Sequence, residues 1–260
     1  MQKLGNRKRG WKVSRERVDL RRVANPSIPV TIEALPQRLT LDLERTAIIV
    51  VDMQNDFCTV GGWLDSVGAD TTPLQGPVEP LNLLLPMLRR LDVPVIWLNW
   101  GNRPDRINLS PSVLHVYNPD GQSPGIGDTL PGKESRILEK GSWGAAVVDG
   151  LRPDSSDIHV DKFRMSGFCD TPLDSILRNM DIHTLLFAGV NTDQCVMHTL
   201  QDAVNLGYDA ILLEDCCATS SPQYCTDATL YNVKQCYGFI ARSSSLLNEI
   251  RLANGKDEER

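Results

Sequence analysis

Five short aliphatic runs constrain the fold of this chain most strongly. Each is apolar at nearly every position, without the alternation of a strand that faces solvent on one side. Such runs are typical of strands buried on both faces of a parallel sheet. They lie at 46–51 (TAIIVV), 94–98 (PVIWL), 158–160 (IHV), 184–190 (TLLFAGV) and 210–213 (AILL).

Amphipathic segments lie between and after these runs, and their apolar residues recur at helical spacing. Gly207 follows one of them, where a glycine commonly ends a helix. The alternation of strand and helix predicts an α/β fold, a doubly wound parallel sheet with helices on both faces. The helices are expected at 80–91, 143–151, 171–180, 193–206 and 222–233, and the Pro- and Gly-rich segment 101–136 is expected to be a long functional loop or lid.

Charge divides the chain into two parts. Residues 1–30 carry nine Lys and Arg against two acidic residues, so the rest of the chain holds a net charge of −13 within a total of −6. We therefore expect a basic N-terminal arm at 1–38 and one catalytic domain at 39–260. The arm suits a solvated extension or a contact with an acidic neighbouring subunit, with a targeting segment or a nucleic-acid tail as alternatives. Pro26, Pro29 and Pro36 favour extended chain there.

Composition also bounds where the protein works and what it binds. No run approaches 18 apolar residues and no secretory signal pattern is present, so neither a membrane nor secretion is expected. The acidic total argues against nucleic acid as a general partner. Seven cysteines without regular spacing indicate free thiols in a reducing cytoplasm.

Three reactive side chains follow three of the expected strands. They are Asp52, Lys162 and Cys195, and the carboxyl ends of parallel strands meet at one edge of the sheet, where ligands bind. We expect Cys195 to be a nucleophile whose pKa is lowered by a helix N-terminus and by Lys162. Asp52 would act as general acid and base, and the backbone N–H groups of Asn191 and Cys195 would form an oxyanion hole.

These residues lie in segments that resemble a known family. The segments VVDMQNDF (50–57), VDKFRMSGF (160–168) and GVNTDQC (189–195) are similar to the active-site motifs of the isochorismatase-like cysteine hydrolases. The resemblance covers about residues 40–245. It implies a six-stranded parallel sheet, an Asp52–Lys162–Cys195 triad, a cis peptide at Val190–Asn191 and a dimer or tetramer.

Two branches of the superfamily share features with the chain. Segments 138–143 and 166–178 resemble ureidoacrylate amidohydrolases, whereas 103–105, 125–128, 211–217 and Gln235 resemble biuret hydrolases, although Met165 stands where those enzymes carry a second lysine. The mixture implies cleavage of a C–N bond in a linear urea-type amide, with ammonia released through a covalent cysteine intermediate. Triuret or biuret is the first expected substrate and ureidoacrylate the alternative.

The expected substrate contacts are weaker predictions than the triad. No cofactor and no metal are expected, because the segment 98–110 lacks the histidine of the metal-binding relatives. A dinucleotide-binding oxidoreductase is disfavoured because no G-x-G-x-x-G follows the first strand. Two further interpretations stay open, a redox-sensing protein and a catalytic dyad of Cys195 with His198. The expected substrate contacts are Gln235, Gln54, Phe57, Asn99 and Arg103.

Overall fold

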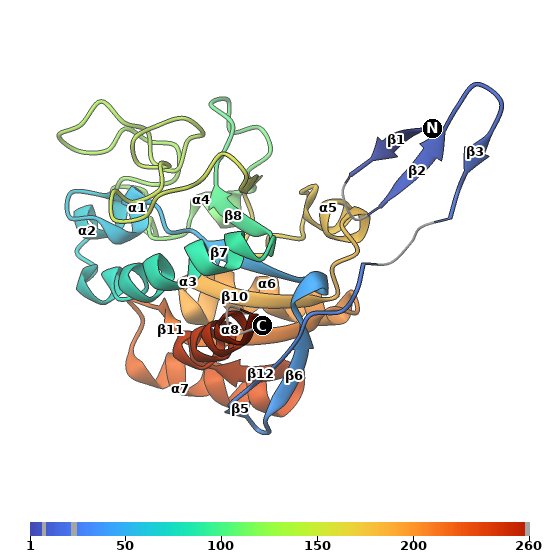
Figure 1. Ribbon diagram of the computed structural model, residues 1–260. Helices are drawn as coiled ribbons and strands as arrows, with labels where there is room; N and C mark the ends of the chain where they lie inside the picture. The colour runs from blue at the N-terminus through green and yellow to red at the C-terminus, as the bar shows by residue number, and fades with distance from the viewer. Residues whose placement is uncertain (7–8, 22–24, 258–260) are drawn as a thin grey trace.

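A seven-stranded sheet forms the centre of the protein in a computed structural model, which describes residues 1–6, 9–21 and 25–257 (Figure 1). The spatial order is β5-β12-β11-β10-β7-β8-β9. Six strands run parallel, and only β5, at one edge, pairs antiparallel with its neighbour. This confirms the doubly wound α/β fold and its six parallel strands. The bounds are β5 (Ala34–Leu35), β7 (Thr46–Val51), β8 (Val95–Trp100), β9 (Ile158–Lys162), β10 (Thr184–Val190), β11 (Asp209–Ala218) and β12 (Gly238–Ala241).

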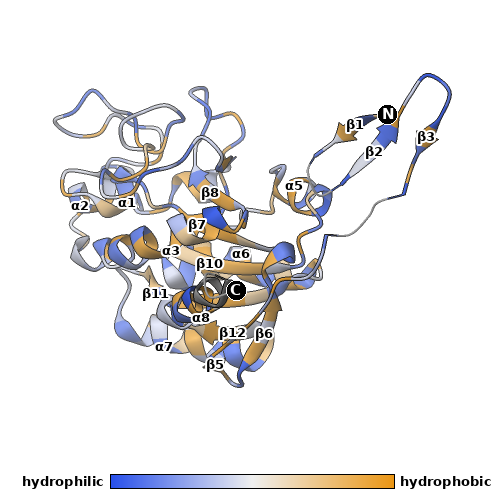
Figure 2. Ribbon diagram, in the orientation of Figure 1, coloured by the Kyte–Doolittle hydropathy of each residue, from blue (hydrophilic) through white to orange (hydrophobic). Residues whose placement is uncertain are grey.

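All five aliphatic runs are strands, and the hydropathy colours show them as the apolar centre of the molecule (Figure 2). Every residue of β7 and β10 is buried, as expected for the two central strands. The sixth parallel strand, β12, has the short sequence GFIA, which did not stand out as an aliphatic run.

Helices cover both faces of the sheet. On one face α3 (Val78–Arg90) packs against α8 (Ser243–Asp257), and on the other α6 (Met197–Asn205) contacts β11 and the π-helical turn η4 (Val233–Tyr237). Four of the five expected helices are present, and Gly207 follows α6 with a φ of 93°. None of the described helices is long and apolar enough to cross a membrane. The remaining helices are α1 (Asn55–Cys58), α2 (Trp63–Ser66), α4 (Pro111–Leu114), α5 (Leu173–Asn179) and α7 (Gln223–Asn232).

The prediction of a helix at 143–151 is wrong. This segment forms turns, because its backbone bonds to the loop after β7 instead of to itself. The amides of Asn55 and Asp56 donate to the carbonyls of Ala146 and Gly144, and Val148 donates to the Met53 carbonyl. The expected long loop at 101–136 is irregular apart from the four residues of α4.

The N-terminal region forms two further antiparallel units. β1 (Gln2–Gly5), β2 (Gly10–Val13) and β3 (Val18–Asp19) make a small sheet that projects from the body (Figure 1). β4 (Pro29–Ile32) pairs with β6 (Leu39–Asp42) and lies against α8, with Val30 and Ile32 buried. The division at residues 38 and 39 stays a prediction, although the chain already packs on the body from β4 onward.

Gly189 allows the two central strands to approach closely at the end of β10. Its φ is 111°, and a Cβ there would collide with the Val51 backbone of β7. L residues disfavour this φ, and the collision is with main chain that cannot move aside. A glycine is therefore required at the end of β10, where it lies against β7.

Replacing Gly189 tests this close approach. We expect Gly189→Ala to lower the free energy of unfolding by at least about 2 kcal/mol, because a strained φ and a backbone collision add. Gly207→Ala is the matched control, since Gly207 also has positive φ but has open space around it. It should lose only about 1 kcal/mol in denaturant unfolding. Equal losses in the two variants would contradict the argument.

Candidate active site

The three expected catalytic side chains meet at the carboxyl edge of the sheet. β7 and β10 are neighbours, and the chain order reverses between them, which is where open α/β sheets bind ligands. Asp52 directly follows β7, and Cys195 lies in the π-helical turn η3 (Thr192–Val196) that follows β10. Lys162 ends the edge strand β9 and reaches across the end of β8. The structure therefore brings Asp52, Lys162 and Cys195 together.

The Lys162 ammonium joins the other two groups. Its Nζ lies 2.8 Å from Asp52 Oδ2 and 3.2 Å from Cys195 Sγ, and it donates to the Arg164 carbonyl at 3.2 Å. An ammonium has three donors, so these partners use all of them. The Trp100 ring lies 4.4 Å from the same nitrogen and adds a cation–π contact on another side. Lys162 is thus a fully buried cation with a complete set of partners.

The carboxylate of Asp52 is held from the opposite side. Its Oδ1 accepts the Trp100 amide at 2.9 Å, and its backbone φ of 49° turns the chain sharply away from β7. Burial raises the pKa of Asp52, and the nearby charge of Lys162 opposes that shift without cancelling it. Burial alone would lower the pKa of Lys162, but Asp52 and Cys195 outweigh it and the pKa rises. The charged lysine therefore persists at the site.

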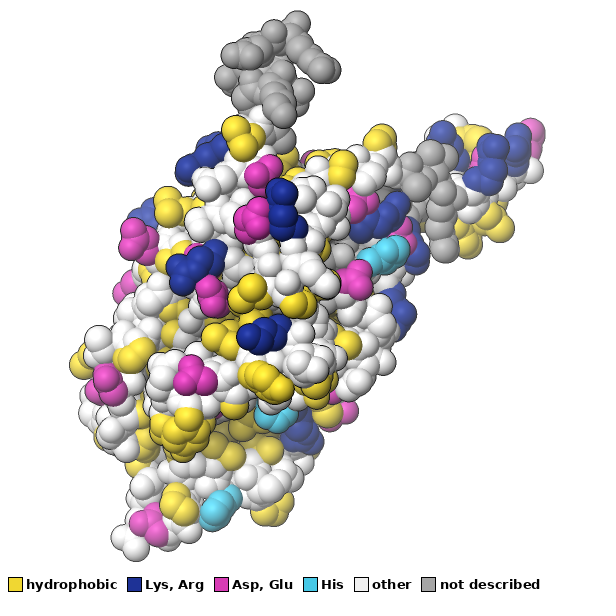
Figure 3. Space-filling model, turned by 90° about the horizontal axis from the view of Figure 1, so that it is seen from below, with side chains coloured by type: hydrophobic (Ala, Val, Ile, Leu, Met, Phe, Trp, Pro, Cys, Tyr) yellow, Lys and Arg dark blue, Asp and Glu magenta, His cyan; other side chains and the backbone are white. Residues whose placement is uncertain are grey.

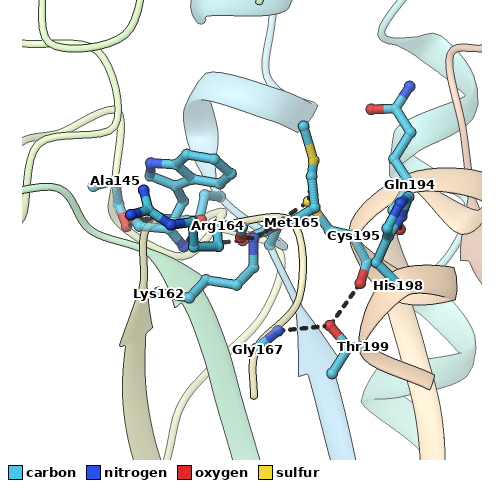
Figure 4. A network of polar contacts seen from close by, with 12 residues as sticks. Ala145, Lys162, Arg164, Met165, Gly167, Gln194, Cys195, His198 and Thr199 are labelled. Atoms are coloured by element: carbon cyan, nitrogen blue, oxygen red, sulfur yellow. Dashed lines mark hydrogen bonds and ion pairs between the residues drawn. The ribbon is translucent and has the colours of Figure 1, made fainter. Parts of the chain in front are cut away.

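Cys195 is a buried thiol at the base of the η3 turn, only 5% exposed. Thr199 Oγ1 donates to the Cys195 carbonyl at 2.6 Å and accepts the Gly167 amide at 3.0 Å, which fixes the turn against the chain after β9 (Figure 4). Met165 Sδ lies 3.7 Å from Cys195 Sγ and covers one side of it.

The expectation of a lowered thiol pKa is wrong. Burial raises the pKa of Cys195 to about 12, because the adjacent Lys162 charge opposes desolvation only in part and the Asp52 charge adds to it. The resting site therefore holds a protonated thiol beside an aspartate–lysine ion pair. The Asp52 carboxylate shares the Lys162 ammonium with the thiol, so a proton acceptor lies beside Cys195.

The turn after β10 has the backbone expected for the oxyanion hole. The peptide Val190–Asn191 is cis, as the family resemblance implies. The Asn191 carbonyl accepts the amides of Gln194 and Val196, and its Oδ1 accepts the Ser220 amide at 3.1 Å. These contacts hold the turn from both sides. The role of the Asn191 and Cys195 N–H groups stays a prediction.

Three of the expected substrate contacts lie after β7 or at the end of β8. Gln54 is fully buried, and its amide is used internally, since Nε2 donates to the carbonyls of Trp100 and Ala145 while Oε1 accepts the Trp100 amide. Phe57 is buried edge-on against Trp63 with ring centroids 6.3 Å apart. Asn99 belongs to the end of β8, and its buried Oδ1 has no hydrogen-bond partner among the described residues. Of these three, Asn99 keeps an unsatisfied polar atom.

The other two expected contacts are exposed. Arg103 is exposed and forms a two-bond ion pair with Asp105 at 2.9 and 2.6 Å. Gln235 is exposed in η4, immediately before β12, and therefore at the amino edge of the sheet. Cys195 follows β10 at the carboxyl edge, so a single chain does not bring Gln235 to the triad.

Several residues of the site were missed in the sequence. Trp100 contacts Asp52 through its amide and Lys162 through its ring, and Met165 and Thr199 contact Cys195. Arg164 donates to the Asn108 carbonyl at 3.0 Å and ties the loop after β9 to the long loop after β8. Their positions near the ends of expected strands were the only available signal. Many of their contacts use backbone amides or carbonyls, which every residue type has, so the sequence does not mark them.

The catalytic histidine and the metal site have little support in the geometry. His198 Nδ1 contacts the Gln194 carbonyl at 2.8 Å, and Figure 4 shows His198 and Gln194 on the other side of Cys195 from Lys162. Among residues 1–6, 9–21 and 25–257, no group of three or more His, Cys, Asp or Glu is placed to hold a metal. All seven cysteines are free.

Comparison with known proteins decides the family. A model of the Isochorismatase domain matches residues 46–245. The chain belongs to the isochorismatase family. It is 35% identical over 212 residues to ureidoacrylate amidohydrolase RutB of Rhizobium rhizogenes, covering 82% of this chain and 86% of that protein. It is also 35% identical over 215 residues to the protein of the same name from Agrobacterium fabrum, covering 82% and 92%.

Solved structures of family members agree with this assignment. A cysteine hydrolase from Pseudomonas syringae pv. phaseolicola superimposes with a TM-score of 0.70 at 26% identity, covering 89% of this chain and 100% of that one. N-carbamoylsarcosine amidase from Thermoplasma acidophilum gives a TM-score of 0.58 at 29% identity, covering 76% and 96%. The expected enzyme class, a hydrolase of the isochorismatase family, is confirmed.

Removing the buried cation tests how the site is held together. We expect Lys162→Met to lower the free energy of unfolding by about 3–5 kcal/mol at neutral pH, since Asp52 is left buried without a partner. The loss should shrink at low pH. With the cation gone the folded-state pKa of Asp52 rises further, so its protonated form is stable in the fold and stability falls as pH rises through that pKa.

The double variant Lys162→Met/Asp52→Asn is the control, because it removes both charges and keeps similar side-chain volumes. It should recover at least about 2 kcal/mol of the loss. A double variant no more stable than Lys162→Met, in urea titrations at two pH values, would show that the ion pair is not what this part of the fold depends on.

Proposed function

We propose that this family member is a cysteine amidohydrolase that cleaves a C–N bond of a linear, ureido-type amide. The observation that carries the proposal is the Lys162 ammonium, which contacts both Asp52 and Cys195, with all three side chains buried. One cation thus touches both a proton acceptor and a thiol. That is the arrangement a nucleophile with a neighbouring base requires.

The first half of the reaction follows from the resting proton positions. Cys195 Sγ attacks the terminal carbamoyl carbon as its proton passes to Asp52, so the charged thiolate forms only with substrate in place. The developing oxyanion is held by the N–H groups of Asn191 and Cys195. The tetrahedral carbon then expels ammonia, which takes the proton from Asp52, and a thioester-like S-carbamoyl enzyme remains.

The second half uses the same aspartate as a base. Asp52 takes a proton from water, and the resulting hydroxide attacks the S-carbamoyl carbon. The carbon–sulfur bond breaks, and Cys195 regains its proton from Asp52. The released carbamate loses carbon dioxide, so one ureido group and one water give ammonia, carbon dioxide and the amine. Lys162 remains charged and keeps both carboxylate and sulfur in position.

For the substrate, we favour a ureido acid of the ureidoacrylate type. The two relatives at 35% identity are both named ureidoacrylate amidohydrolases and match most of the chain. The case for triuret or biuret rests on segments 103–105, 125–128 and 211–217 and on Gln235, and of these Gln235 lies at the opposite edge of the sheet within one chain. Triuret and biuret therefore become the second candidates instead of the first.

The substrate is tested by measuring ammonia release from ureidoacrylate, triuret and biuret in parallel, without added metal. We expect kcat/KM to be at least about 100-fold higher for ureidoacrylate, because a discrimination of about 3 kcal/mol is within reach of a dedicated site. Faster release from triuret or biuret would overturn the substrate assignment while leaving the amidohydrolase chemistry intact.

The nucleophile is tested by Cys195→Ser, which should keep the fold and lower kcat by at least about 1,000-fold, since an unactivated hydroxyl replaces the thiol. Cys169→Ser is the matched control, because Cys169 is exposed and free. Circular dichroism and ammonia release check both variants. A kcat of Cys195→Ser within tenfold of the wild type would refute Cys195 as the nucleophile, because tenfold corresponds to only about 1.4 kcal/mol of activation free energy.

The pH profile of activity tests the protonation states proposed for Asp52 and Cys195. Activity requires Asp52 as a carboxylate, and burial raises the pKa of Asp52, so kcat/KM should fall on the acid side at a pH above the ordinary value of about 4. On the alkaline side the Cys195 pKa of about 12 predicts no fall from the triad through pH 9. If the pKa of Cys195 were instead lowered, kcat/KM would fall on the acid side near neutral pH, where the thiolate becomes protonated.

A further inference from the structure

The small N-terminal sheet is amphipathic. In its antiparallel register Leu4 pairs with Trp11, and Lys3 pairs with Lys12. Paired residues point to the same face and successive residues to opposite faces. Leu4 and Trp11 therefore share one face, and the two lysines share the other. Val13 and Val18 are paired as well, and the register of β2 with β3 places them on the face of Leu4 and Trp11. Leu20 directly follows β3, and continued alternation from Val18 would put it on the same face.

The apolar face of this sheet is uncovered. Leu4, Val18 and Leu20 are 62%, 49% and 59% exposed, and Trp11 is 37% exposed. Figure 3 shows the sheet projecting from the body with apolar side chains along one side and Lys and Arg along another. The apolar face of so small a sheet contributes to stability only where it is removed from water. An isolated ribbon with this face in solvent is therefore incomplete.

Contacts at one end fix the sheet to the body. Asn6, which follows β1, donates Nδ2 to the Asn179 carbonyl at 2.8 Å, and Arg9, which precedes β2, pairs with Asp181 at 2.5 Å. Arg45, from the body, pairs with the same Asp181 carboxylate. The base of the sheet is thus anchored, while its apolar face is carried away from the chain's own core (Figure 1).

Charge identifies the partner. Residues 1–30 have seven net positive charges and the remaining residues thirteen net negative charges. A basic, apolar arm held away from its own acidic body is complementary to the body of another molecule of the same chain. We propose that β1–β3 is a docking arm whose apolar face, built on Leu4, Trp11, Val13, Val18 and Leu20, packs on a second copy of this chain.

The proposal does not rest on the chemistry of the triad. A homo-oligomer is expected from the family resemblance, but the arm, its apolar face and the residues that form it come from the strand register and exposure. If two molecules related by a two-fold axis exchanged arms, both apolar faces would be buried. Each basic arm would then lie on the acidic body of the other molecule.

Matched cross-strand pairs allow a direct test on the full-length protein. Leu4→Thr/Trp11→Thr changes one pair on the apolar face, and Lys3→Thr/Lys12→Thr changes the adjacent pair on the polar face. Threonine favours strands at all four positions. Sedimentation velocity across a concentration series should show at least a tenfold weaker self-association for the apolar-face variant. The lysine variant should weaken it by less than about threefold, and only at low salt.

A second measurement locates the contact. An equal mixture of ¹⁴N- and ¹⁵N-labelled protein, joined by a zero-length carboxyl–amine cross-linker, should give mixed-isotope peptides that link arm lysines to carboxylates of the body. A wild-type monomer at all concentrations, or unchanged assembly in the apolar-face variant, would overturn the proposal. So would a monomer that sediments with vesicles of phosphatidylcholine and phosphatidylserine, which would assign the arm to a membrane surface.

Discussion

The buried ammonium of Lys162 is the interaction on which the site depends. Without it, Asp52 would be a carboxylate in an apolar interior, and such groups become protonated or destabilise the fold. With it, Asp52 is held as the carboxylate of an ion pair while Cys195 stays a thiol. The same cation orders three segments distant in sequence, because it bonds the end of β7, the turn after β10 and the Arg164 carbonyl after its own strand.

The surrounding structure supports this ion pair mainly through the backbone. Trp100 gives its amide to Asp52 and its ring to Lys162, and Gln54 bridges Trp100 to Ala145. The segment 143–148 therefore packs beside the triad, and its backbone hydrogen-bonds to the loop after β7. Gly189 lets β10 lie close enough to β7 for the thiol and the carboxylate to share one cation.

The fold and the triad could be predicted because their signals are local and chemically distinct. An uninterrupted aliphatic run indicates a buried strand, and an Asp, a Lys and a Cys after such runs must meet at one edge. The segment 143–151 misled because its apolar spacing resembles a helix, whereas its backbone amides and carbonyls are used by another loop. Gln235 misled because spacing from Cys195 along the chain does not say on which edge of the sheet a residue lies. The thiol pKa was misjudged because the sequence shows the neighbouring cation but not the depth of burial, which here outweighs it.

The raised pKa of Cys195 has a consequence for the life of the enzyme between turnovers. Oxidants, electrophiles and soft metal ions react with thiolates, and a thiol that stays protonated and almost covered offers them very little. A cysteine activated permanently by a low pKa would be exposed to such damage throughout the protein's lifetime. In the proposed mechanism Cys195 is unreactive at rest, and it reacts only with a bound substrate whose carbon accepts the sulfur as the proton leaves.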